Sequence, residues 1–116
     1  MTEVTIYHNP RCSKSRETLK LLQSRGIAPN IRLYLETPLT ITELKTLLTQ
    51  LGCPVRDLMR TKEARYRELG LDQVQTEDTL LKAICDNPIL MERPVVVRGD
   101  QAVIGRPPEN VLALLS

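Results

Sequence analysis

The residue best placed to do chemistry is Cys12, because it lies between a predicted strand and a predicted helix. A thiol at a helix start faces unpaired backbone amides and the positive end of the helix dipole, and both favour the thiolate. Nearby cationic side chains, His8, Arg11, Lys14 and Arg16, would lower the thiol pKa further. The same amides can hold an anion. One loop therefore offers a nucleophile and a place for an oxyanion.

The thiol has no second cysteine three residues further on. The segment reads Cys-Ser-Lys-Ser, so Ser15 stands where dithiol oxidoreductases carry their second cysteine. Such a site forms an adduct or a mixed disulfide but cannot resolve it locally, so an outside thiol must complete the reaction unless Cys53 or Cys85 comes close. Both have structural interpretations: Cys53 lies at a predicted helix end, and Cys85 in a predicted helix is a small core residue.

The elements that position Cys12 begin with a βαβ unit. Residues 3–7 alternate between apolar and polar and predict a strand, and a helix from Cys12 or Ser13 ends before Gly26. Ile31, Leu33 and Leu35 alternate with polar residues and predict a second strand, parallel to the first.

The middle of the chain is predicted to be helical. Thr40 and Glu43 have the spacing of a capping box, and the helix they open carries an apolar stripe up to Gly52. A short turn at 55–59, a weakly amphipathic helix at 63–69 and a helix opened by Thr76 follow.

The end of the chain predicts a ββα unit. Two β-rich runs flank Gly99 and Asp100, which is typical of a hairpin, and Pro107 or Pro108 opens a terminal helix. The order βαβ, helical insert, ββα predicts an α/β protein with the thioredoxin-like fold and its mixed four-stranded sheet. No linker or repeat appears, so we expect one domain over residues 1–116.

Composition excludes several functional classes. Of 116 residues, 41% are hydrophobic and none is Phe or Trp, so the core is aliphatic and aromatic platforms for nucleic-acid bases are lacking. The net charge of +2 is too small to indicate a surface that binds the phosphate backbone of a nucleic acid. No apolar run is long enough to span a membrane. Three widely spaced cysteines form neither a disulfide framework nor a zinc pattern. We expect a cytoplasmic protein without metal, bound cofactor, nucleic acid or membrane.

Four segments carry a resemblance to a known family. They are 8–16 (His-Asn-Pro-x-Cys-Ser-x-Ser-Arg), 55–60, 87–97 and 105–107 (Gly-Arg-Pro). In this order and with this spacing, the segments resemble the glutaredoxin-linked arsenate reductase (ArsC) family, which has the thioredoxin-like fold, over essentially the whole chain.

The resemblance implies an oxidoreductase that reduces arsenate to arsenite, with glutathione as co-substrate and glutaredoxin as reductant. It implies that Cys12 is the catalytic nucleophile, that His8 helps to hold it as thiolate, and that Arg60, Arg93 and Arg106 bind the oxyanion. Guanidinium groups suit that task because they stay protonated and grip two oxygens at once. The resemblance also places Arg93-Pro94 where thioredoxin-like proteins have a cis proline. Asn9 and Ser15 either support the thiolate or simply cap the helix.

Two alternatives remain open at this point. The chain could be a thiol-dependent reductase or deglutathionylase acting on another substrate. It could also be a regulator of the Spx type, a thioredoxin-like protein that binds RNA polymerase. Members of that type typically carry Cys-x-x-Cys, so Ser15 and the three arginines speak against it.

Overall fold

The computed structural model describes residues 3–115, which form two compact units. We call the first the thiol unit; it contains the described residues up to Thr37 and those from Arg93 onward. The second is the insert unit, Pro38–Glu92. The predicted helical insert therefore corresponds to a unit of its own, while the expectation of one domain over residues 1–116 stays a prediction.

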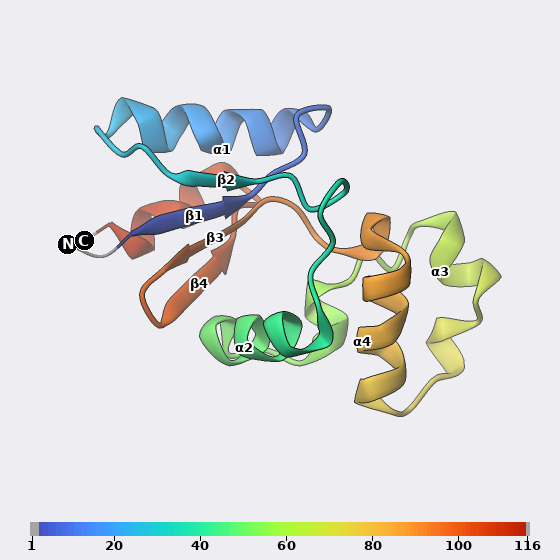
Figure 1. Cartoon of the computed structure of the whole chain (residues 1–116). Helices are drawn as coiled ribbons and strands as arrows, with labels where there is room; N and C mark the ends of the chain where they lie inside the picture. The colour runs from blue at the N-terminus through green and yellow to red at the C-terminus, as the bar shows by residue number, and fades with distance from the viewer. Residues whose placement is uncertain (1–2, 116) are drawn as a thin grey trace. The chain divides into compact units, whose positions relative to one another are not determined.

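A mixed four-stranded sheet organises the thiol unit (Figure 1). Its strands are β1 (Val4–Tyr7), β2 (Asn30–Arg32), β3 (Val95–Arg98) and β4 (Gln101–Ile104), in the spatial order β2-β1-β3-β4. β1 pairs parallel with β2, and β3 pairs antiparallel with both β1 and β4. The β3–β4 turn contains Gly99 at φ 63°, which confirms the predicted hairpin. With α1 between β1 and β2, this arrangement is the thioredoxin-like fold that the element order predicts.

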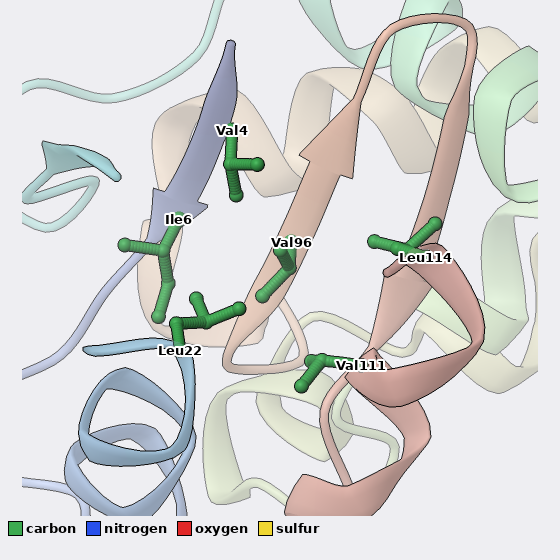
Figure 2. Close-up of a cluster of buried hydrophobic side chains, with 6 residues drawn as sticks. All are labelled: Val4, Ile6, Leu22, Val96, Val111 and Leu114. Carbon is green, nitrogen blue, oxygen red and sulfur yellow. The ribbon is translucent and has the colours of Figure 1, made fainter. Parts of the chain in front are cut away.

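Two helical segments complete the thiol unit. α1 (Ser13–Ser24) lies between the parallel strands in sequence, and the 3₁₀ segment η4 (Pro108–Leu114) packs beside it. The predicted terminal helix is thus present, in 3₁₀ form. The core consists of aliphatic side chains from β1, α1, β3 and η4 (Figure 2), namely Val4, Ile6, Leu22, Val96, Val111 and Leu114.

The second strand is shorter than the sequence predicts. β2 ends at Arg32, and the amides of Glu36 and Thr37 donate to the carbonyl of Leu33, which closes a turn. Because the turn breaks the two-residue alternation, Leu35 is exposed and Tyr34 is fully buried. The expectation that Leu33 and Leu35 continue a strand was therefore wrong.

The insert unit is helical, as predicted. It contains α2 (Ile41–Leu51), η1 (Val55–Leu58), α3 (Ala64–Glu68), η2 (Leu71–Gln73), α4 (Glu77–Asp86) and η3 (Pro88–Leu90). The capping box is confirmed: the Glu43 amide donates to Thr40 Oγ1, and the Thr40 amide donates to the Glu43 carboxylate. α2 packs against α4, and the buried residues are Leu44, Leu47 and Leu48 on α2 and Leu80, Leu81 and Ile84 on α4. Across residues 3–115, no helix has the length and apolar character needed to cross a bilayer.

Candidate active site

Cys12 is the N-cap residue of α1. Its amide donates to the Asn9 carbonyl at 3.0 Å and its carbonyl accepts from the Arg16 amide, so the loop delivers the thiol directly to the helix start. Burial raises the pKa of Cys12, but hydrogen bonds from the Ser15 and Lys14 amides and the nearby Arg93 guanidinium outweigh burial and lower it. The helix start therefore favours a thiolate nucleophile, for the reason inferred from sequence.

Two predicted anion-binding arginines lie at this sulfur. Arg106 Nη1 donates to Cys12 Sγ over 3.8 Å and to the Arg93 carbonyl at 3.3 Å. Burial lowers the pKa of Arg93, while interactions with Cys12 and Tyr34 outweigh it and raise that pKa. Both arginines precede a proline in a cis peptide bond, Arg93-Pro94 and Arg106-Pro107. The resemblance pointed to the former and gave no sign of the latter.

Arg93 has unused hydrogen-bonding capacity. Its Nε and Nη1 atoms are buried and find no acceptor among the residues that the structure describes. Buried donors without partners cost free energy, roughly 1–3 kcal/mol each, and more for charged groups. An oxyanion beside the Cys12 sulfur would supply the missing acceptors.

His8 reaches the site through Ser15. His8 Nδ1 lies 2.6 Å from Ser15 Oγ, which also accepts the Asn9 amide at 3.0 Å. Burial, followed by the charge of Arg16, lowers the pKa of His8, so the imidazole is neutral at pH 7. Because Ser15 Oγ already accepts one hydrogen bond, its own hydrogen suits a Nδ1 that carries no proton.

Asn9 and Ser15 thus hold the loop together. The Asn9 side chain accepts the Arg11 amide at 3.0 Å, and the Ser15 hydroxyl joins strand end, loop and helix. The contribution of Ser15 to the thiolate comes from its backbone amide. Whether His8 is needed for catalysis stays a prediction.

Sequence reasoning missed a close approach beside the site. A Cβ built on Gly105 would lie 2.9 Å from Thr18 Oγ1 and 3.0 Å from Pro94 Cγ. Thr18 is fully buried on α1, and the Gly105 amide donates to the Pro94 carbonyl at 2.9 Å. A threonine on the apolar face of a helix is a faint sequence signal, and nothing along the chain links it to a glycine 87 positions later.

The third predicted arginine, Arg60, belongs to the insert unit. Its guanidinium pairs with Glu63 at 3.4 Å and with Glu92 at 3.5 Å, and its amide donates to the Leu90 carbonyl. The assignment of Arg60 to the same anion as Arg93 and Arg106 stays a prediction.

Cys53 and Cys85 also belong to the insert unit, and each is half-buried. Burial raises the pKa of both thiols, with Asp57 adding to the effect at Cys53 and Asp86 at Cys85. Neither environment favours a thiolate at neutral pH. Within residues 3–115, no three His, Cys, Asp or Glu side chains gather as metal ligands.

Comparisons with known proteins converge on one family. The sequence pattern of the ArsC family matches residues 7–114. The chain is 50% identical to a protein of Neisseria meningitidis named arsenate reductase, covering 99% of this chain and 100% of that one. It is 55% identical to the uncharacterized protein YfgD of Escherichia coli K12, over 97% of each chain. A solved structure titled arsenate reductase from Vibrio cholerae superposes with a TM-score of 0.94 at 53% identity, over 97% of each chain.

Proposed function

The chain belongs to the ArsC family, and from that membership we propose that it is an arsenate reductase, an oxidoreductase that converts arsenate to arsenite. The observation that carries the proposal is the pairing of a thiol of lowered pKa, Cys12, with two guanidinium groups at its sulfur. The unpartnered buried donors of Arg93 supply binding capacity for an oxyanion.

Charge explains why this arrangement suits arsenate. Arsenate is an anion near neutral pH, so a thiolate approaching its arsenic atom meets repulsion. Arg93 and Arg106 offset that repulsion without acting as acids, since guanidinium groups remain protonated. Buried, prearranged donors stabilise the charge that develops during attack more than donors in water would.

In the proposed reaction, thiols replace two arsenic-bound oxygens before arsenic is reduced. The Cys12 thiolate attacks dihydrogen arsenate, and one arsenate oxygen takes up a solvent proton and leaves as water. Glutathione adds to the arsenic and a second water leaves. A glutaredoxin thiol attacks the glutathione sulfur, forming a mixed disulfide and leaving As(III) on Cys12. Hydrolysis releases arsenite and regenerates the thiol.

In this scheme the reducing electrons come from outside the chain. Ser15 stands where a resolving cysteine would be, and Cys53 and Cys85 have raised pKa values, so none of them favours an internal disulfide. We therefore propose glutathione as co-substrate and glutaredoxin as partner, with no bound cofactor. A reducing cytoplasm is the compartment that would sustain these thiols.

The test is arsenate-dependent oxidation of NADPH, coupled through glutathione, glutathione reductase and glutaredoxin. We expect turnover that requires arsenate, glutaredoxin and Cys12, and that disappears in Cys12→Ser. Turnover that persists without glutaredoxin would contradict the proposed reductant. Absence of turnover with all components present would contradict the arsenate assignment.

A second candidate keeps the thiol chemistry and changes the substrate. A low-pKa cysteine without a resolving partner also suits a reductase or deglutathionylase of other thiol adducts. Release of glutathione from a glutathionylated peptide faster than arsenate reduction would favour that function. A pull-down with the wild type and Cys12→Ser tests the Spx-type alternative: recovery of RNA polymerase subunits would support it, and recovery of glutaredoxin would support the reductase.

A further inference from the structure

Three chain segments of the thiol unit that carry site residues meet at Gly105. Thr18 lies on α1, Pro94 immediately precedes β3, and Gly105 immediately follows β4. Each segment also carries a residue of the site: Cys12 is the N-cap of α1, Arg93 precedes Pro94, and Arg106 follows Gly105.

The meeting point leaves no room for a side chain at position 105. A Cβ there would approach Thr18 Oγ1 to 2.9 Å, Thr18 Cγ2 to 3.1 Å and Pro94 Cγ to 3.0 Å. Gly105 has no positive φ, so its backbone conformation is one that residues with side chains adopt. Glycine is required here by the close approach and not by the backbone angle.

Thr18 is held firmly on its own helix. Its hydroxyl donates to the Lys14 carbonyl at 2.8 Å, and its Oγ1 lies 3.4 Å from the Gly105 carbonyl. The side chain is fully buried, so it cannot swing into solvent to make room. Pro94 is tied to Gly105 from the other side by the hydrogen bond from the Gly105 amide.

We propose that Thr18 is a positioning residue for the anion site: together with Pro94 it forms the slot that seats Gly105, and so fixes Arg106 at the Cys12 sulfur. Arg106 is the next residue after Gly105, so a displacement of Gly105 moves the Arg106 guanidinium away from both Cys12 Sγ and the Arg93 carbonyl. The inference rests on the proposed function only in naming arsenate as the anion.

The test uses Gly105→Ala, Thr18→Ala and the double variant, and reads the anion site without requiring turnover. Cys12 is alkylated with iodoacetamide at increasing arsenate concentrations, with sulfate in parallel, and the anion concentration giving half-protection is recorded. In Gly105→Ala we expect that concentration to rise roughly ten-fold or more, as for loss of one charge-assisted contact. Thr18→Ala in the same chain removes both Thr18 contacts and should restore part of the protection.

A control variant separates positioning from general destabilisation. Gly26→Ala places a side chain at φ 78° with nothing within 4 Å, at the opposite end of α1 from Cys12. Gly26→Ala should lower the melting temperature and leave the anion concentration for half-protection of Cys12 unchanged. Thermal melts by circular dichroism confirm that each variant is folded at the assay temperature.

The outcomes decide between the two proposals. If folded Gly105→Ala needed the same anion concentration for half-protection as the wild type, the positioning role would be overturned. The same would follow if the double variant were no better protected than Gly105→Ala. Protection of the wild type without arsenate turnover would overturn the proposed function and leave the positioning role standing. Failure of both anions to protect wild-type Cys12 would overturn both.

Discussion

At Cys12, two physical effects on the thiol pKa oppose each other. Burial favours the neutral thiol, while the amides of Ser15 and Lys14 and the charge of Arg93 favour the thiolate. The second group wins, and it consists mostly of features fixed by the fold. His8, which its position in the sequence suggested as a cation, is instead neutral, because its ring is buried near Arg16. Burial of a particular ring cannot be predicted from the sequence, whereas the start of a helix can.

The lowered pKa of Cys12 predicts a distinct pH dependence. A thiol whose pKa is depressed ionises at a lower pH than an ordinary thiol, and its reactivity is lost as the pH falls through that pKa. Alkylation of Cys12 should therefore have a midpoint below about 8.5, the value of an ordinary thiol. Peptide mapping of alkylated protein across pH measures this. Cys53 and Cys85, whose pKa values are raised, serve as internal controls. A Cys12 midpoint at or above theirs would contradict the interpretation.

The cysteines should also differ in their effect on turnover. Cys12→Ser should abolish arsenate-dependent NADPH oxidation, while Cys53→Ala and Cys85→Ala retain most of it, because their environments do not favour thiolates. Steady-state rates of the three purified variants check this. If Cys53→Ala were as inactive as Cys12→Ser, an internal thiol relay would replace the single-cysteine mechanism.

The Ser15 hydroxyl and the Ser15 backbone amide should have separate effects, the first on stability and the second on the Cys12 pKa. Ser15→Ala leaves His8 Nδ1 and the Asn9 amide without their partner in a buried place, which should cost about 1–3 kcal/mol of unfolding free energy. The backbone amide survives, so the pH midpoint of Cys12 alkylation should stay low. Urea denaturation and alkylation measure the two effects, with exposed Ser24→Ala as the control. A large rise in the midpoint would show that the hydroxyl itself stabilises the thiolate.

At the scale of elements, patterns within a few residues were predicted well. The capping box, the α1 start and the Gly99 hairpin each depend on neighbours in sequence, so their signals were present in the chain itself. The boundary of β2 depended on a turn that offered no glycine or proline as a marker, and Tyr34 became the buried residue. The contact of Gly105 with Thr18 joins segments far apart in sequence, so no local pattern could indicate it.

The capping box of α2 offers a stability prediction at this scale. Thr40→Ala removes the acceptor for the Glu43 amide and should lower the free energy of unfolding by about 1 kcal/mol. Thr46→Ala, in the exposed middle of the same helix, should have little effect because alanine favours the helix interior. Urea denaturation of both full-length variants makes the comparison. Equal stability of Thr40→Ala and wild type would mean that the cap contributes nothing to folding.

At the scale of the whole molecule, the three predicted anion-binding arginines are divided between the two units. Arg93 and Arg106 belong to the thiol unit and lie at the Cys12 sulfur, while Arg60 belongs to the insert unit and pairs with Glu63 and Glu92. The resemblance to the ArsC family implies all three from the spacing of the matching segments. The geometry of the thiol unit provides a physical reason for two of them.

The kinetics of Arg60→Ala test whether the third arginine serves the same anion. If it does, arsenate kcat/KM should fall roughly ten- to hundred-fold, the worth of one charge-assisted contact, and Arg60→Lys should recover part of the loss. Arg65→Ala removes an exposed ion pair with Glu68 from the same unit and should leave the kinetics unchanged. Wild-type kinetics in folded Arg60→Ala would remove Arg60 from the site.

The position of the insert unit within the chain also bears on evolution. Residues 38–92 leave the thiol unit after Thr37 and rejoin it at Arg93, so the unit is a single uninterrupted segment. A segment with both ends joined to one host can be exchanged by two recombination events, which would leave the cysteine, two arginines and the sheet in place. The host would keep its nucleophile through such an exchange and acquire a different helical segment. Lineages could thus vary residues 38–92 while the cysteine and its two arginines stay unchanged.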